Sequence, residues 1–130
     1  KEAFDFDASI EPKNLPALFA DEQNLKFIRS FFRDCYDLCM KLLTYLAQSF
    51  SIDTNYFTSR HQWDLPSGDT LRLLHYPSME KQSEASIRAG AHSDYGSLTL
   101  LFQHDQKSGL EVLDRANGVW YRVQPFDDMI

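Results

Sequence analysis

The sequence predicts an α+β fold in which one long amphipathic helix supports a small antiparallel β-structure. Apolar residues recur at three- and four-residue steps from about residue 21 to residue 50, which indicates a helix with one buried face. Short apolar runs separated by turn-forming residues then follow toward the end of the chain. A helix followed by closely spaced strands is typical of an α+β arrangement in which the helix supports a sandwich or barrel.

The totals are those of a globular domain. The chain has 130 residues, of which 43% are hydrophobic and 25% charged, and its formal net charge of −6 argues against a nucleic-acid or anionic-membrane surface. No apolar run reaches the ~20 residues that span a bilayer. Two cysteines without a secretory signal predict a reducing, cytoplasmic location. We expect residues 1–69 to form an irregular segment and a helical scaffold, and residues 70–130 to begin a β-domain.

The first half of the chain is predicted to be irregular and then helical. Pro12 and Pro16 interrupt residues 1–20, where Phe4 and Phe6 are available to dock on a larger body. No Gly or Pro interrupts the helix expected from Asp21 to Phe50. Its predicted apolar stripe consists of Ile28, Phe31, Phe32, Cys35, Leu38, Cys39, Leu42, Leu43, Leu46 and Phe50. The two cysteines are expected to be small buried hydrophobes, because no further cysteine completes a soft-metal site.

The second half is predicted to form strands. Residues 66–69 indicate a turn, 70–76 a strand closed by Pro77, and 78–87 a polar loop. Further strands are expected at 97–103, 110–113, 119–123 and from 129 onward. Hairpin connections are expected at 107–109 and 116–118, and the second is the stronger signal because it contains Asn-Gly.

His92 and Asp94 are the candidate metal ligands. In an extended backbone, residues i and i+2 point to one face, so a His-x-Asp that enters a strand offers a nitrogen and an oxygen side by side. These are two corners of the 2-His-1-carboxylate triad of non-haem Fe(II) enzymes. The alternative is a turn in which Asp94 caps backbone amides. A hydrolase relay of Ser93 or Ser97 with His92 and Asp94 is disfavoured, because the base must lie between its partners in space.

Four stretches occur together in the order and spacing of one family. They are Leu71–Pro77, Gly90–Leu101, Gly109–Leu113 and Gly118–Pro125, and the Lys-Glu-x-Phe opening agrees with them. The chain resembles the isopenicillin N synthase-like Fe(II)/2-oxoglutarate-dependent dioxygenases over essentially its whole length, although it matches only the middle part of a full-length member.

The resemblance implies a double-stranded β-helix, or jelly roll, here incomplete at its C-terminal side. It also implies that His92 and Asp94 are the first two iron ligands and that Tyr76 helps to hold the 2-oxoglutarate carboxylate. Leu74 stands where plant members usually carry Asn, and Leu101 and Leu110 match positions that line the substrate pocket. The family's distal His and Arg-x-Ser are expected beyond Ile130, because the histidines at 61, 75 and 104 do not fit the family spacing.

The expected function is therefore that of an Fe(II)- and 2-oxoglutarate-dependent oxygenase. With O2 it would oxidise, by default hydroxylate, a small organic substrate, with no nucleic-acid or membrane partner and no catalytic residue beyond the metal ligands. Residues 1–130 alone are expected to be inactive. The alternative is a non-catalytic fragment or binding module on the same scaffold, which lacks the distal His and Arg-x-Ser.

Overall fold

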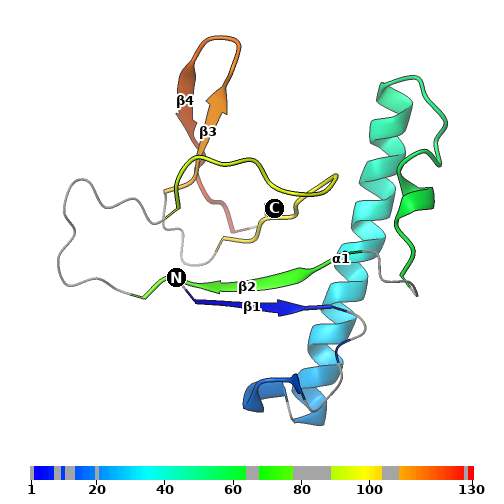
Figure 1. The fold of residues 1–130 in the computed structure, drawn as a ribbon, viewed down its shortest axis with the longest axis vertical. Coiled ribbons are helices and arrows are strands. Elements are labelled where there is room, and N and C mark those ends of the chain that lie inside the picture. The colour runs from blue at the N-terminus through cyan, green and yellow to red at the C-terminus, as the bar shows by residue number, and fades with distance from the viewer. Residues whose placement is uncertain are drawn as a thin grey trace. The chain divides into compact units, whose positions relative to one another are not determined.

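The computed structural model of the chain describes residues 2–7, 10, 14–19, 21–63, 68–77, 89–103, 109–127 and 129–130. The chain divides into two compact units, Lys1–Leu98 and Thr99–Ile130. In the described residues one long α-helix and two two-stranded antiparallel sheets form an α+β fold, as predicted (Figure 1). No helix within these ranges is both long and apolar enough to cross a membrane.

The helix α1 spans Glu22–Ser49, which confirms the predicted helix. Asp21 caps its N-terminus, because its side-chain oxygen Oδ1 accepts hydrogen bonds from the backbone N–H groups of Gln23 and Asn24 at 2.9 and 3.1 Å. At the other end the Phe50 N–H donates to the Leu46 carbonyl at 3.2 Å. Both ends of α1 are thus defined by local hydrogen bonds.

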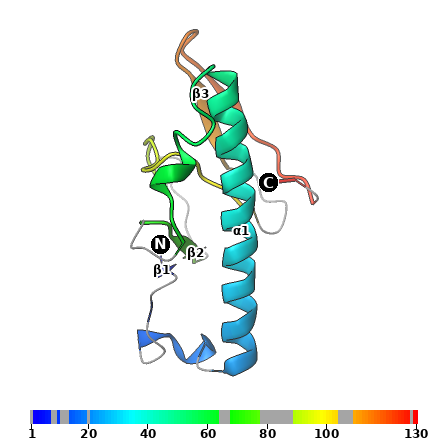
Figure 2. The ribbon, with the colours of Figure 1, turned by 90° about the vertical axis from the view of Figure 1, so that its right-hand side faces the viewer.

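One face of α1 is buried, and it is narrower than the predicted stripe. Its fully buried residues are Ile28, Phe32, Leu43 and Ala47. The prediction is wrong at Leu42 and Phe50, which are 38% and 62% exposed. Phe50 lies past the last helical residue, and Leu42 lies at the edge of the stripe. The short 3-10 helices η2 (Ala17–Phe19) and η3 (Thr58–Arg60) both lie against α1 (Figure 2).

The first sheet joins two segments of the first unit that lie far apart in the sequence. Strand β1 (Glu2–Phe6) pairs antiparallel with β2 (Leu71–His75), and Phe6 lies opposite Leu71 (Figure 1). The strand predicted at 70–76 is therefore confirmed. The prediction that residues 1–20 are irregular is wrong for β1. The partner strand of β1 lies far along the sequence, and no local pattern indicates the pairing.

The core of the first unit binds this sheet to the helix. Phe6, Phe19, Ile28 and Phe32 form one buried cluster, and Leu71 packs against it. The rings of Phe6 and Phe32 meet edge to face with centroids 6.0 Å apart, a favourable geometry for aromatic pairs. One face of the β1–β2 sheet therefore packs against α1.

The opposite face of that sheet carries an ion pair. Arg72 lies opposite Asp5 in the register, and its Nε and Nη2 atoms donate to the two Asp5 carboxylate oxygens at 2.6 and 2.7 Å. This bidentate contact raises the pKa of the Arg72 guanidinium. Because side chains alternate along a strand, Leu74 lies on the same face as Arg72.

The second unit contains a β-hairpin. Strands β3 (Glu111–Asp114) and β4 (Val119–Arg122) pair antiparallel, within one residue of the predicted bounds. The Asn117-Gly118 turn is also confirmed, since Gly118 has a φ of 67°, which favours glycine. The Gly118 N–H donates to the Asp114 carbonyl at 2.7 Å and closes the loop.

The Asp114 carboxylate stabilises this turn through hydrogen bonds, and these bonds make the stability depend on pH. It accepts hydrogen bonds from the Asn117 side chain and the Ala116 N–H at 2.7 and 2.9 Å, and these bonds lower the pKa of Asp114. A lowered folded-state pKa adds stability above the ordinary carboxyl pKa, and this is lost as the pH falls through the lowered value. We expect Asn117→Ala to raise the pKa of Asp114, measured by NMR titration of its carboxyl carbon. An unchanged pKa would contradict this account.

Two predicted strands do not form. Within the described residues 97–103 there is no strand, and near the chain end the Met129 N–H donates to the Phe126 carbonyl at 3.4 Å in a turn. A strand needs a neighbour that satisfies its backbone N–H and C=O groups, and no described segment pairs with either stretch. The loop predicted at 78–87 lies outside the described residues, as do positions 66–67 and 107–108 of the predicted turns.

Candidate metal centre

His92 and Asp94 lie side by side at the surface of the first unit. The Nε2 atom of His92 is 3.3 Å from Oδ1 of Asp94, and the two side chains are 65% and 56% exposed. The Nδ1 atom of His92 lies 2.7 Å from the Gly90 carbonyl oxygen. Since a carbonyl only accepts, Nδ1 donates to Gly90, and Nε2 is the ring nitrogen that faces the Asp94 carboxylate.

This arrangement fits a divalent metal ion. Two donors on adjacent corners, each ~2.1 Å from one metal, lie about 3 Å apart. A ligating histidine usually donates its other ring N–H to a carbonyl or carboxylate, as His92 does to Gly90. A divalent cation would bind to the lone pairs of Nε2 and of the carboxylate oxygen, which already face one another. Within the described residues no group of three or more His, Cys, Asp and Glu side chains could hold a metal.

The His92 and Asp94 side chains lie close together without the strand that was predicted to pair them. We predicted that a strand would place both side chains on one face, yet residues 91–94 form no strand. The side chains nevertheless converge, and the Gly90 carbonyl orients the His92 ring. The juxtaposition thus does not depend on a β-strand.

Tyr76 and Leu74 lie at the end of β2. Tyr76 directly follows the strand and is half-buried, whereas Leu74 is exposed on the sheet face opposite α1. Alternation predicts that Arg72, Leu74 and Tyr76 share one side, and the register confirms this for Arg72 and Leu74. The role of Tyr76 toward a carboxylate stays a prediction.

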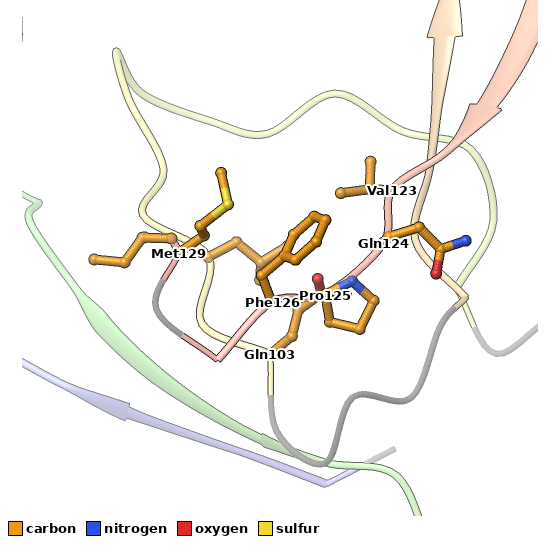
Figure 3. A pocket seen from close by; sticks show the side chains of 8 residues that line it. Gln103, Val123, Gln124, Pro125, Phe126 and Met129 are labelled. Atoms are coloured by element: carbon orange, nitrogen blue, oxygen red, sulfur yellow. The ribbon is translucent and has the colours of Figure 1, made fainter.

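Leu101 and Leu110, the other predicted pocket residues, lie in the second unit. Leu101 lines an apolar cavity of about 230 Å³. The cavity is lined by Leu101, Gln103, Val123, Gln124, Pro125, Phe126, Met129 and Ile130 (Figure 3). Leu110 is half-buried outside this lining, and its carbonyl accepts a hydrogen bond from the Val123 N–H at 3.0 Å. Their contact with a substrate stays a prediction.

A histidine-centred hydrogen-bond chain was missed by the sequence reasoning. In the first unit, Nδ1 of His61 lies 3.0 Å from Oδ1 of Asp69, and its Nε2 lies 3.3 Å from Oγ of Ser97. No spacing signal announces this chain, because its members come from three separate stretches. The relay of Ser97 with His92, which the sequence disfavours, is not formed, since Ser97 contacts His61 instead.

The two cysteines behave as predicted. Cys35 and Cys39 are free and half-buried on α1, and burial raises the pKa of both thiols. A raised pKa leaves little reactive thiolate. They are therefore packing residues.

A His-x-Asp pair supplies two of the three ligands of the 2-His-1-carboxylate triad, which is typical of mononuclear non-haem iron enzymes. Residues 67–130 match the family model described as the 2OG-Fe(II) oxygenase superfamily. Over this region the chain is similar to that superfamily, whose metal is Fe(II) and whose cosubstrate is 2-oxoglutarate. The matched region includes His92, Asp94 and Tyr76.

Several curated fungal proteins are similar to the chain. The 2-oxoglutarate-Fe(II) type oxidoreductase hxnY of Emericella nidulans is 33% identical over 117 residues, which are 88% of this chain and 32% of that protein. The proline hydroxylase buaE of Petromyces alliaceus is 32% identical over 134 residues, 98% of this chain and 40% of that protein. The chain thus spans about a third of the length of these relatives. No solved structure matches it.

Proposed function

We propose that the protein containing this chain is an Fe(II)- and 2-oxoglutarate-dependent dioxygenase that hydroxylates a small organic substrate, and that the chain forms part of a jelly-roll domain. The observation that carries the proposal is the His92–Asp94 pair, with Nε2 and Oδ1 3.3 Å apart and Nδ1 of His92 2.7 Å from the Gly90 carbonyl oxygen. The superfamily match over residues 67–130 supports the same chemistry.

His92 and Asp94 would hold the iron through Nε2 and Oδ1, together with a ligand from outside the described residues. When bound, Fe(II) supplies the oxidation of substrate by O2, coupled to the decarboxylation of 2-oxoglutarate to succinate and CO2. The chain's own contribution is geometric. The Gly90 carbonyl accepts from Nδ1–H of His92, so that Nε2 is the ring nitrogen that would bind the metal.

Tyr76 would orient the cosubstrate. Its phenolic hydroxyl is a donor at the end of β2, and a carboxylate is the acceptor with which such a donor forms a strong bond. Leu74 lies two residues before Tyr76 and has no side-chain hydrogen-bond donor. Tyr76 would therefore form the hydrogen bond to the cosubstrate without a second one from position 74. Leu74, Leu101 and Leu110 would supply apolar surface toward the substrate.

Metal removal tests the proposed activity in the full-length protein. Succinate is measured with 2-oxoglutarate, O2 and a panel of small substrates that begins with free proline, since one relative is named a proline hydroxylase. We expect succinate release to fall to background after chelation and to return with Fe(II). Binding of Fe(II) and 2-oxoglutarate without succinate release from any substrate would favour the non-catalytic module.

A further inference from the structure

His61 connects three parts of the first unit that are far apart in the sequence. Its backbone carbonyl accepts a hydrogen bond from the Tyr36 hydroxyl of α1 at 2.9 Å. Its ring bridges Asp69, just before β2, and Ser97, just after the candidate metal ligands, at 3.0 and 3.3 Å. Figure 2 shows the connector that contains His61 running alongside α1. The histidine is thus a junction between the helix, the sheet and the segment that carries His92 and Asp94.

Both nitrogen atoms of the His61 ring have a polar partner. Asp69 accepts from Nδ1–H, and Nε2 lies within hydrogen-bond distance of the Ser97 hydroxyl. The His61 and Asp69 side chains are only 18% and 25% exposed, which removes much of the competition from water. Tyr36 on the backbone and Asp69 on the ring thus hold His61 at two points besides Ser97.

We propose that His61 is a positioning residue for the candidate metal ligands, acting through Ser97. Three residues span at most about 10 Å, so an anchor at Ser97 restricts where the backbone of Asp94 can lie. The proposal rests on the proposed function only in taking His92 and Asp94 as the ligands. Without the anchor at Ser97, the segment that carries His92 and Asp94 must become ordered when the metal binds. The free-energy cost of this ordering lowers the metal affinity.

The chain Asp69–His61–Ser97 also has the order of an acyl-transfer relay. Such a relay requires hydrogen-bond donors aimed at a developing oxyanion as well as the three side chains. Ser97 instead follows the ligand pair by three residues, which favours an anchoring role. We expect no labelling of Ser97 by a fluorophosphonate probe, and stoichiometric labelling would overturn the positioning role in favour of a nucleophile.

The test measures Mn(II) binding to the metal-free full-length protein by calorimetry, with Mn(II) in place of Fe(II) to avoid oxidation. Ser97→Ala and His61→Leu are each expected to raise the dissociation constant on the order of tenfold, as for other residues that support a ligand. The double variant is expected to be no weaker than either single variant, because both changes break one link. Ser97→Thr keeps the hydroxyl and is expected to restore binding.

Ser59→Ala is the matched control, since the Ser59 hydroxyl also lies in the connector but contacts the Tyr56 carbonyl, at 3.4 Å. It is expected to leave Mn(II) affinity unchanged. The thermal midpoint of each metal-free variant is measured in parallel. Parent-like affinity in Ser97→Ala and His61→Leu would overturn the proposal, and so would a loss that Ser97→Thr does not restore. Failure of the ligand assignment is distinguishable, because then His92→Ala and Asp94→Ala would also bind Mn(II) normally.

Discussion

Replacement of His92 by alanine is expected to reduce 2-oxoglutarate turnover by on the order of 10³-fold or more. Loss of a residue that only supports a ligand typically costs 10–100-fold in metal affinity or activity, and loss of the ligand itself costs more. Asp94→Ala is expected to have an effect of the same size, because it removes the carboxylate 3.3 Å from Nε2 of His92. The measurement is succinate released by the full-length protein at saturating Fe(II).

His75→Ala is the control for this experiment. His75 is also an exposed histidine close to a carboxylate, with Nδ1 2.7 Å from Oε2 of Glu2, but it lies at the end of the β1–β2 sheet and belongs to no proposed site. Its replacement is expected to leave turnover at the parent level. Substantial turnover in either His92→Ala or Asp94→Ala would end the ligand assignment.

Replacement of Phe6 by alanine is expected to lower the free energy of unfolding by about 3–5 kcal/mol, the usual cost of removing a buried phenylalanine. Phe6 is 0% exposed and joins β1 to α1 through its edge-to-face contact with Phe32. A whole domain is typically stable by only ~5–15 kcal/mol, so this single change would consume a large share of it. Urea denaturation of the full-length protein measures the loss.

Phe27→Ala is the matched control for Phe6→Ala. It also removes a phenylalanine side chain, but one in α1 that is 70% exposed. Its effect is expected to stay within about 0.5 kcal/mol, as for most surface changes. Equal destabilisation by the two variants would show that the Phe6 cluster is not the core of this unit.

Part of the candidate site was predictable because its signals are local. His92 and Asp94 are two residues apart, so their proximity follows from almost any extended or turn-like backbone, and the error about a strand did not separate them. The contact of His61 with Ser97 had no such signal, since the two residues are 36 positions apart in the sequence. The same holds for Leu101, whose cavity is completed by residues near the chain end.

Local patterns along the chain are sufficient to predict α1, the Asn117-Gly118 hairpin and the donor pair of His92 and Asp94. Helical periodicity, a turn dipeptide and a two-residue spacing each act within a few residues, so a single stretch of chain specifies them. The folded structure was needed to show that Glu2–Phe6 is a strand, that Phe6 is buried and that His61 contacts Ser97. Those contacts join distant segments, and their free energy depends on which surfaces leave water together, which no local pattern records.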